Sequence, residues 1–154
     1  MKNFSIRLLT VLFVFIKLYA FGQVNLNLEK EKVKYQYDKR RTEGSYSLST
    51  VIGKSMQVNF DCCFDDSVHI YINNILEEKV FLKTDGSTSF TGHALIVTFN
   101  PKDKKSTLKI ILPYKKVFCE IDLDKKYKML HVNRMEHWDK TWWITFRNFG
   151  IAYE

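Results

Sequence analysis

Hydrophobic and polar residues alternate along most of the chain after residue 23. Val24, Leu26 and Leu28 are separated by polar residues, and the same period of two recurs in many short runs further along. The apolar positions of those runs are Val33, Tyr35 and Tyr37; Tyr46 and Leu48; Met56, Val58 and Phe60; Val68, Ile70 and Ile72; Leu108, Ile110 and Leu112; and Val117, Cys119, Ile121 and Leu123. Successive side chains of a strand point to opposite faces, so this period predicts strands with one buried face.

The breaks between the runs also indicate β-structure. Asn73-Asn74 separates two apolar runs, and asparagine tolerates the positive φ that a two-residue hairpin turn requires. Residues 94–99 are continuously apolar, as in a strand covered on both faces, and no stretch carries the apolar stripe of an amphipathic helix. We therefore predict an all-β, antiparallel β-sandwich of immunoglobulin-like or jelly-roll type, with a closed β-barrel as the alternative.

Residues 1–22 have the layout of a secretory signal peptide. Two basic residues precede an apolar run at residues 8–16, and the small residues Ala20 and Gly22 occupy the positions that a signal peptidase reads. The apolar run is shorter than the roughly 20 residues needed to cross a bilayer. We expect cleavage after Gly22, a single β-sandwich domain at residues 23–154, a secreted or periplasmic location, and no integral membrane segment after cleavage. An uncleaved N-terminal anchor is the alternative.

The charge of the domain is mild once the signal peptide is removed. The chain has 24 lysines and arginines against 17 acidic residues, a net charge of +7. Three of the basic residues lie in the signal peptide, which leaves 21 basic residues and a net charge of +4. Basic runs at residues 39–41, 102–105 and 125–128 contain or adjoin an aspartate. We read these runs as solvated turns and expect no nucleic-acid partner.

The three cysteines raise the question of a disulfide, because an exported protein enters an oxidising compartment. Cys62 continues the inward positions of the run that ends at Phe60, and Cys119 lies in the inward set of its own run. The alternation predicts a bridge between Cys62 and Cys119 that joins the two sheets. Three alternatives remain, namely a Cys63–Cys119 bridge, a vicinal Cys62–Cys63 bond, and three unpaired thiols.

Sequence signatures of metal sites and enzymes are absent. The acidic residues Asp61, Asp65 and Asp66 lack the glycine and terminal glutamate of a calcium loop. The four histidines show neither HxH nor HExxH spacing, and the chain has no GxSxG, P-loop or GxGxxG motif. We expect no metal site, no cofactor and no catalytic residue. A small hydrolase that uses two carboxylates is the remaining enzymatic alternative.

The C-terminal third is the most informative part of the chain. All three tryptophans lie between residues 138 and 143, and two strands are expected at residues 127–133 and 142–148. Alternation places one set of large and polar side chains on the outward faces of these strands. The candidate binding residues are Tyr127, His131, Trp138, Trp143 and Arg147. Aromatic and arginine side chains are favoured at binding surfaces. The alternative is that the aromatic set completes the core and covers an edge.

Matching apolar side chains across these two strands predicts their register. We expect Leu130 opposite Ile144 and Val132 opposite Trp142, which places His131 opposite Trp143. The same register sets Met129 opposite Thr145 and Tyr127 opposite Arg147. A slip by one residue would mix inward and outward positions, so burial should enforce an even register.

These observations lead to one functional expectation and two alternatives. We expect an exported, non-enzymatic β-sandwich protein that binds a partner protein or a surface glycan. The alternatives are a structural or accessory protein of the cell envelope and the small carboxylate-dependent hydrolase. The exposure of Trp138 and Trp143 discriminates between a binding surface and a core made of the same residues.

Overall fold

The computed structural model describes residues 27–38, 45–47, 54–136 and 139–151, and this part of the chain forms twelve strands without a helix. The strands are β1 (Glu29–Lys30), β2 (Lys32–Tyr37), β3 (Ser45–Ser47), β4 (Ser55–Phe60), β5 (Asp65–Ile72), β6 (Ile75–Lys83), β7 (His93–Thr98), β8 (Thr107–Leu112), β9 (Val117–Asp122), β10 (Met129–Met135), β11 (Thr141–Arg147) and β12 (Phe149–Ile151). Within these ranges there is accordingly no helix long and apolar enough to cross a membrane.

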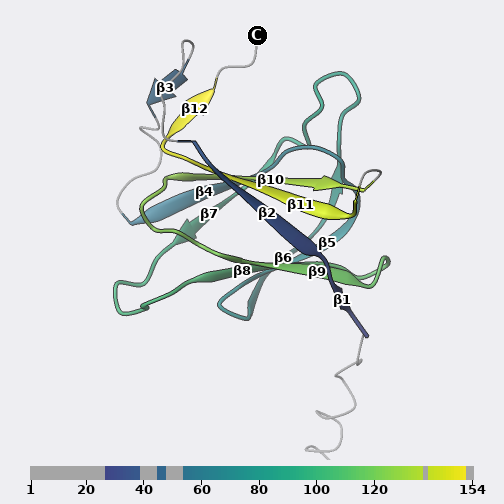
Figure 1. The fold of residues 1–154 in the computed structure, drawn as a ribbon, viewed down its shortest axis with the longest axis horizontal. Coiled ribbons are helices and arrows are strands. Elements are labelled where there is room, and N and C mark those ends of the chain that lie inside the picture. Colours follow the sequence, from purple (N-terminus) through teal and green to yellow (C-terminus); the bar gives the residue numbers. More distant parts are fainter. Residues whose placement is uncertain (1–26, 39–44, 48–53, 137–138, 152–154) are drawn as a thin grey trace, which may run out of the picture.

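Ten of the strands make two five-stranded sheets that lie one over the other (Figure 1). Sheet A has the order β1-β9-β8-β5-β6, and sheet B has the order β2-β11-β10-β4-β7; β3 and β12 form a separate pair. The predicted β-sandwich is confirmed, and the sheets do not close into a barrel. The sheets are mixed rather than wholly antiparallel, because β1 runs parallel to β9, β4 to β10 and β2 to β11. Such parallel neighbours arise because the chain repeatedly crosses between the sheets.

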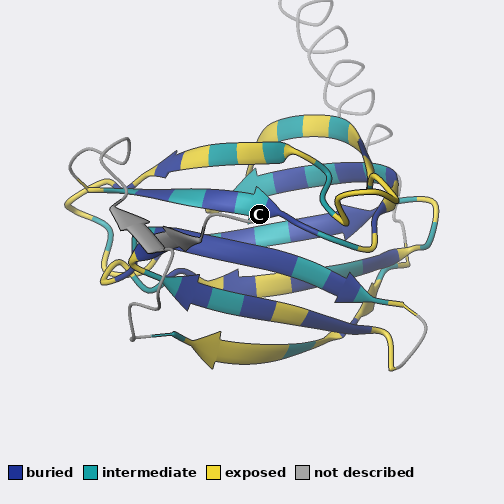
Figure 2. Cartoon of the chain, turned by 90° about the horizontal axis from the view of Figure 1, so that it is seen from above, coloured by how far each residue is buried: buried dark blue, intermediate teal, exposed yellow. Residues whose placement is uncertain are grey.

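Between the sheets lies the core that the alternating pattern predicts. Buried and more exposed residues alternate along the inner strands (Figure 2). On β4 the inward residues Met56, Val58 and Phe60 are buried, and on β9 the inward residues Val117, Cys119 and Ile121 are buried. The Asn73-Asn74 turn also forms as predicted, with φ of 50° and 65° at the two asparagines and Ile72 opposite Ile75.

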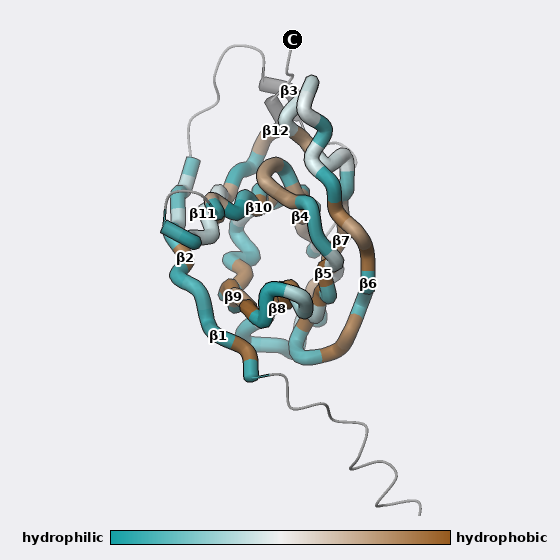
Figure 3. The backbone as a smooth tube through the Cα atoms, turned by 90° about the vertical axis from the view of Figure 1, so that its right-hand side faces the viewer, coloured by the Kyte–Doolittle hydropathy of each residue, from teal (hydrophilic) through white to brown (hydrophobic). Residues whose placement is uncertain are grey.

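One flank of the sandwich is joined by a single run of chain. β1 pairs with β9 in sheet A, and only Glu31 separates it from β2, which pairs with β11 in sheet B. Viewed end-on, β1 and β2 follow one side of the molecule while β6 lies on the other (Figure 3). Glu31 is therefore held at the point where the chain changes sheets.

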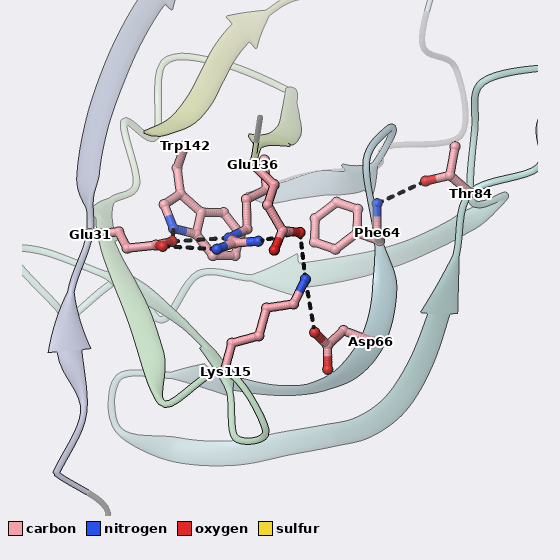
Figure 4. A network of polar contacts seen from close by, with 8 residues as sticks. Glu31, Phe64, Asp66, Thr84, Lys115, Glu136 and Trp142 are labelled. Atoms are coloured by element: carbon pink, nitrogen blue, oxygen red, sulfur yellow. Dashed lines mark hydrogen bonds and ion pairs between the residues drawn. The ribbon is translucent and has the colours of Figure 1, made fainter. Parts of the chain in front are cut away.

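A row of charged side chains starts at Glu31 and connects the sheets (Figure 4). Glu31 accepts two hydrogen bonds from the Arg134 guanidinium, from Nε to Oε2 at 3.0 Å and from Nη2 to Oε1 at 2.8 Å. Arg134 Nη1 also lies 3.0 Å from a Glu136 carboxylate oxygen, and Lys115 bridges Glu136 to Asp66 on β5. Glu31 and Arg134 are both buried, so each depends on the other for its charge to be tolerated.

Candidate binding face

The outer face of sheet B carries the most concentrated set of polar and aromatic candidates. The registers place Gln36, Thr145, His131, Asn59 and Ala94 in one row across the five strands. The neighbouring row contains Lys34 on β2, Trp143 on β11 and Asn133 on β10, and on the other side Gln57 lies next to Met129. These residues project away from the core because their neighbours along each strand are the inward set. We call this surface the binding face.

Trp143 is the exposed aromatic side chain of the binding face. It is 39% exposed, whereas its neighbour Trp142 on the inward side is fully buried. Lys34 Nζ lies 5.2 Å from the centroid of the Trp143 ring and 2.9 Å from Asp139 Oδ2. A shallow depression is lined by Trp143, Lys34, Gln36 and Thr145 together with the backbone neighbours Tyr35 and Ile144. The depression thus joins an apolar ring surface to amide, hydroxyl and ammonium groups.

A second depression of about 300 Å³ lies across β10, β4 and β7. His131 and Met129 line it from β10, and Gln57 and Asn59 line it from β4. His131 Nδ1 lies 2.8 Å from Asp61 Oδ2, and the Gln57 amide donates to Asn59 Oδ1 at 2.7 Å. These contacts fix the orientation of the polar side chains before any ligand is present.

The five predicted binding residues have different outcomes. Trp143 and His131 lie on the binding face, although His131 is only 7% exposed and lines the depression. Arg147 projects on the same side and forms an ion pair with Asp38 at 3.3 Å. Tyr127 was expected to face outward, and this expectation is wrong, because it is buried against Phe146. Trp138 lies outside the described residues.

The predicted register of the C-terminal hairpin is wrong by two residues. The structure pairs Leu130 with Phe146, Val132 with Ile144 and His131 with Thr145. The pairing continues through Arg134, which lies opposite Trp142, so β10 extends beyond the expected end of the strand. Because the side-chain period of a strand is two, a shift of two residues leaves the paired residues of β10 and β11 on their predicted faces; Tyr127 precedes β10 and is the exception.

The predicted Cys62–Cys119 disulfide is also wrong, since all three cysteines are free thiols. β4 ends at Phe60, and the chain then turns through Cys63, whose φ is 74°. The inward position after the turn is taken by Phe64, which packs on Phe60 and on the Trp142 ring. The alternation that we extended to Cys62 therefore stops one residue after the strand.

Cys62 and Cys63 lie next to each other at this turn. Partial burial raises the pKa of the Cys62 thiol to about 12, and a hydrogen bond with Cys63 and the nearby Asp61 carboxylate add to the shift. Cys119 is fully buried in the core, and burial raises its pKa well above the usual value. Neither Cys62 nor Cys119 is thus a reactive thiolate at neutral pH.

Several residues of the binding face were not predicted from the sequence. Asp61 was considered only as part of an acidic stretch without the features of a calcium loop. Gln57, Asn59, Lys34 and Gln36 were only the polar positions that alternate with the apolar ones. The signal that would have found them is parity: once Trp143 is placed outward, its neighbours in adjacent strands are the outward residues of those strands. Their order across the sheet depends on the parallel pairings, which the sequence does not reveal.

Within the described ranges, no cluster of three or more histidine, cysteine, aspartate or glutamate side chains is placed to hold a metal ion. Of the described residues that line the depression beside His131, one carries a carboxylate, namely Asp61. Two-carboxylate chemistry requires a second acid on the opposite wall. Comparison of the chain with models of protein families, with curated proteins and with solved structures finds no match.

Proposed function

We propose that this protein is a non-enzymatic binding protein whose binding face takes a carbohydrate ligand, with Trp143 as the stacking residue. The observation that carries the proposal is the position of Trp143. A large aromatic side chain is partly exposed on a sheet face where its immediate neighbours on β2, β10 and β11 are amides, a hydroxyl and an amine, and the exposed apolar residue Ile96 lies away from it on β7. If Trp143 served only to fill the core, its ring would be covered by apolar side chains.

The chemistry of the face favours a sugar ring. An indole offers a flat apolar surface, on which the apolar side of a sugar ring packs, while the hydroxyls at the ring edge need hydrogen-bond partners. Gln36 and Asn133 provide amide donors and acceptors on either side of Trp143, and Thr145 provides a hydroxyl next to it along β11. The Lys34 ammonium is held beside the ring by Asp139, so little side-chain entropy is lost when a ligand binds.

The two alternative functions fit the face less well. A structural role in which the aromatic residues are buried does not explain why Trp143 is 39% exposed. A two-carboxylate hydrolase would need a partner for Asp61, whose carboxylate instead holds His131. A protein partner remains the competing ligand class and is an outcome of the test below.

The test compares two exposed aromatic residues on different parts of the molecule. Trp143 lies on the binding face, and Tyr114, 81% exposed, lies in the turn between β8 and β9 of the other sheet. The purified domain is screened against immobilised glycans, and bound glycans are then measured with Trp143→Ala and Tyr114→Ala. We expect Trp143→Ala to abolish binding and Tyr114→Ala to retain it. Absence of any glycan binding, together with Trp143-dependent capture of an envelope protein, would replace the carbohydrate with a protein partner.

We propose in addition that the domain acts outside the cytoplasm after removal of residues 1–22. This proposal is supported by the basic, apolar and small-residue order of the N-terminal sequence. The intact mass of the protein recovered from a secreting host tests it. A mature chain beginning at Gln23 is expected, and a mass that still includes residues 1–22 would contradict it.

A further inference from the structure

Met129 and His131 form an unusual pair in the depression beside the binding-face row. They occupy alternate positions of β10, so both side chains project from the outer face of sheet B. His131 Nε2 lies 2.8 Å from Met129 Sδ. This distance is short, because an N–H···O hydrogen bond has a similar length and sulfur is the larger atom.

The hydrogen bond between His131 and Asp61 determines which ring nitrogen faces the Met129 sulfur. His131 Nδ1 lies 2.8 Å from the Asp61 carboxylate. An ionised carboxylate accepts hydrogen bonds but cannot donate them. With Nδ1 donating to that carboxylate, Nε2 faces the Met129 sulfur; it offers a lone pair in the neutral tautomer and an N–H group in the cation. The thioether of Met129 also offers lone pairs. In the neutral tautomer, Nε2 and Sδ thus present two electron pairs side by side in a depression that opens to solvent.

A cation between the two atoms would satisfy both. A carboxylate that holds one nitrogen of a histidine, while the other nitrogen faces outward, is the usual arrangement around a metal-binding histidine. Thioether sulfur is a soft ligand that selects Cu(I), whereas calcium and magnesium prefer oxygen, and imidazole is also a good copper ligand. The side chain of Met129 has three rotatable bonds, so its sulfur can withdraw to admit an ion.

We propose that Met129 and His131 bind one Cu(I) ion, with Asp61 as the positioning residue that orients His131. The depression of about 300 Å³ gives the ion access from solvent, and the Asn59 amide lies across the strand from His131 at the same level. The site is independent of the carbohydrate proposal, because stacking on Trp143 requires neither metal ligand. No electron transfer is involved, since the ion binds and leaves in the same oxidation state.

The test must separate this site from the cysteines, because thiols also bind Cu(I). The full chain carrying Cys62→Ser and Cys63→Ser is therefore used, and Cys119 stays buried in the core. Under anaerobic conditions the protein competes for Cu(I) with a coloured Cu(I) chelator. We expect uptake of one ion per chain. Met129→Leu and His131→Gln should each weaken binding by at least about tenfold, and Met135→Leu at the end of β10 is the matched control that should not.

A second measurement follows the methionine methyl groups by NMR in the cysteine-substituted chain, so it does not depend on how the ligand variants fold. Addition of Cu(I) should shift the Met129 methyl signal and leave that of Met135 in place. Asp61→Asn should keep this Met129 shift while the affinity falls by about 10–100-fold, as expected for a positioning residue. The proposal is overturned if the cysteine-substituted chain takes up no Cu(I), if either ligand variant binds as tightly as the parent, or if the Met129 signal does not respond.

Discussion

The indole nitrogen of Trp142 donates a hydrogen bond of 2.7 Å to Glu31 Oε2, across a sequence separation of 111 residues. Glu31 lies where the chain passes from β1 to β2, and Trp142 lies on the inner face of β11. The same carboxylate accepts two hydrogen bonds from Arg134. The buried carboxylate of Glu31 thus connects β1 and β2 to the hairpin of β10 and β11. This hairpin also carries Trp143 of the binding face.

The first prediction concerns this carboxylate. Glu31→Gln keeps the size of the side chain and removes the charge, which leaves the buried Arg134 with Glu136 as its one remaining ionic partner among the described residues. Breaking a buried ion pair on one side costs about 3–5 kcal/mol, and we expect the free energy of unfolding to fall by about 3 kcal/mol because Glu136 compensates in part. Urea denaturation measures the change.

Two comparisons test whether burial is the cause. Lys34→Ala breaks an exposed ion pair with Asp139 and should cost less than about 1 kcal/mol. The double variant Glu31→Leu with Arg134→Leu removes both charges. Its loss of free energy of unfolding should be smaller than the sum of the losses in the two single variants. A Glu31→Gln variant as stable as Lys34→Ala would show that the pair contributes little.

The second prediction contrasts the adjacent tryptophans. Trp142 is fully buried and touches Phe64, so Trp142→Ala should destabilise the domain by about 3–5 kcal/mol as a large core deletion. Trp143 is on the outer face, and Trp143→Ala should cost less than about 1 kcal/mol, because it loses mainly surface packing. Thermal melting of the two variants gives the comparison. Equal destabilisation would mean that Trp143 is covered and that the binding face is a second core layer.

The third prediction concerns the thiols. Cys63 is exposed, Cys62 is half-buried with a pKa of about 12, and Cys119 is buried. Native protein at pH 8 should therefore react rapidly with iodoacetamide at one thiol, and Cys63→Ser should remove that rapid phase. All three cysteines should react after denaturation without a reducing agent. Recovery of only one reactive thiol there would mean that two cysteines are paired in solution.

The hydrophobic pattern predicted most inward positions of the sandwich, but the expectation that residues 94–99 are covered on both faces is wrong, because β7 is an edge strand on which Ile96 is exposed. Val58 and Ile121, for example, lie in the core as their parity requires, because burial of one strand face is a local consequence of the sequence. Parity also placed Trp142 inward and Trp143 outward. These predictions survive a register error, since a shift by two residues keeps each side chain on its face.

The pairing of strands depended on contacts that no local pattern contains. The first strand of the C-terminal hairpin was expected to end at Asn133, which left Arg134 in the connection between the two strands. Its burial is possible only because Glu31 lies beside it, 103 residues earlier in the chain. In the structure β10 continues through Arg134, which lies opposite Trp142, in a register two residues from the expected one.

The candidate site shows the same division between local and distant information. The outward position of His131 follows from alternation, whereas its partner Asp61 comes from the end of β4, 70 residues away. β4 lies parallel to β10. This pairing requires the chain to cross between the sheets. Similarly, Lys34 reaches Trp143 through the parallel pairing of β2 with β11. Sequence reasoning therefore found the tryptophan and the histidine without their surroundings.

The last prediction concerns Glu136, in the middle of the charged row between Arg134 and Lys115. A hydrogen bond from Lys115, together with the charge of Arg134, lowers the pKa of the Glu136 carboxyl below its usual value. Because the folded-state pKa is lower than the unfolded one, ionised Glu136 stabilises the fold at pH values above the unfolded pKa of about 4.3. That stabilisation is lost as the pH falls through the folded pKa, where the carboxyl takes up a proton in both states.

Glu136→Gln should therefore lower the urea midpoint at pH 7, and the difference from the wild type should narrow progressively below about pH 4. Glu77→Gln, at an exposed position on β6, is the matched control and should track the wild type at every pH. The effect should also weaken in high salt, because Glu136 is partly exposed and its ion pairs are screened. A Glu136→Gln difference that stays constant from pH 7 to pH 3 would contradict an electrostatic origin, since a change of packing alone does not titrate.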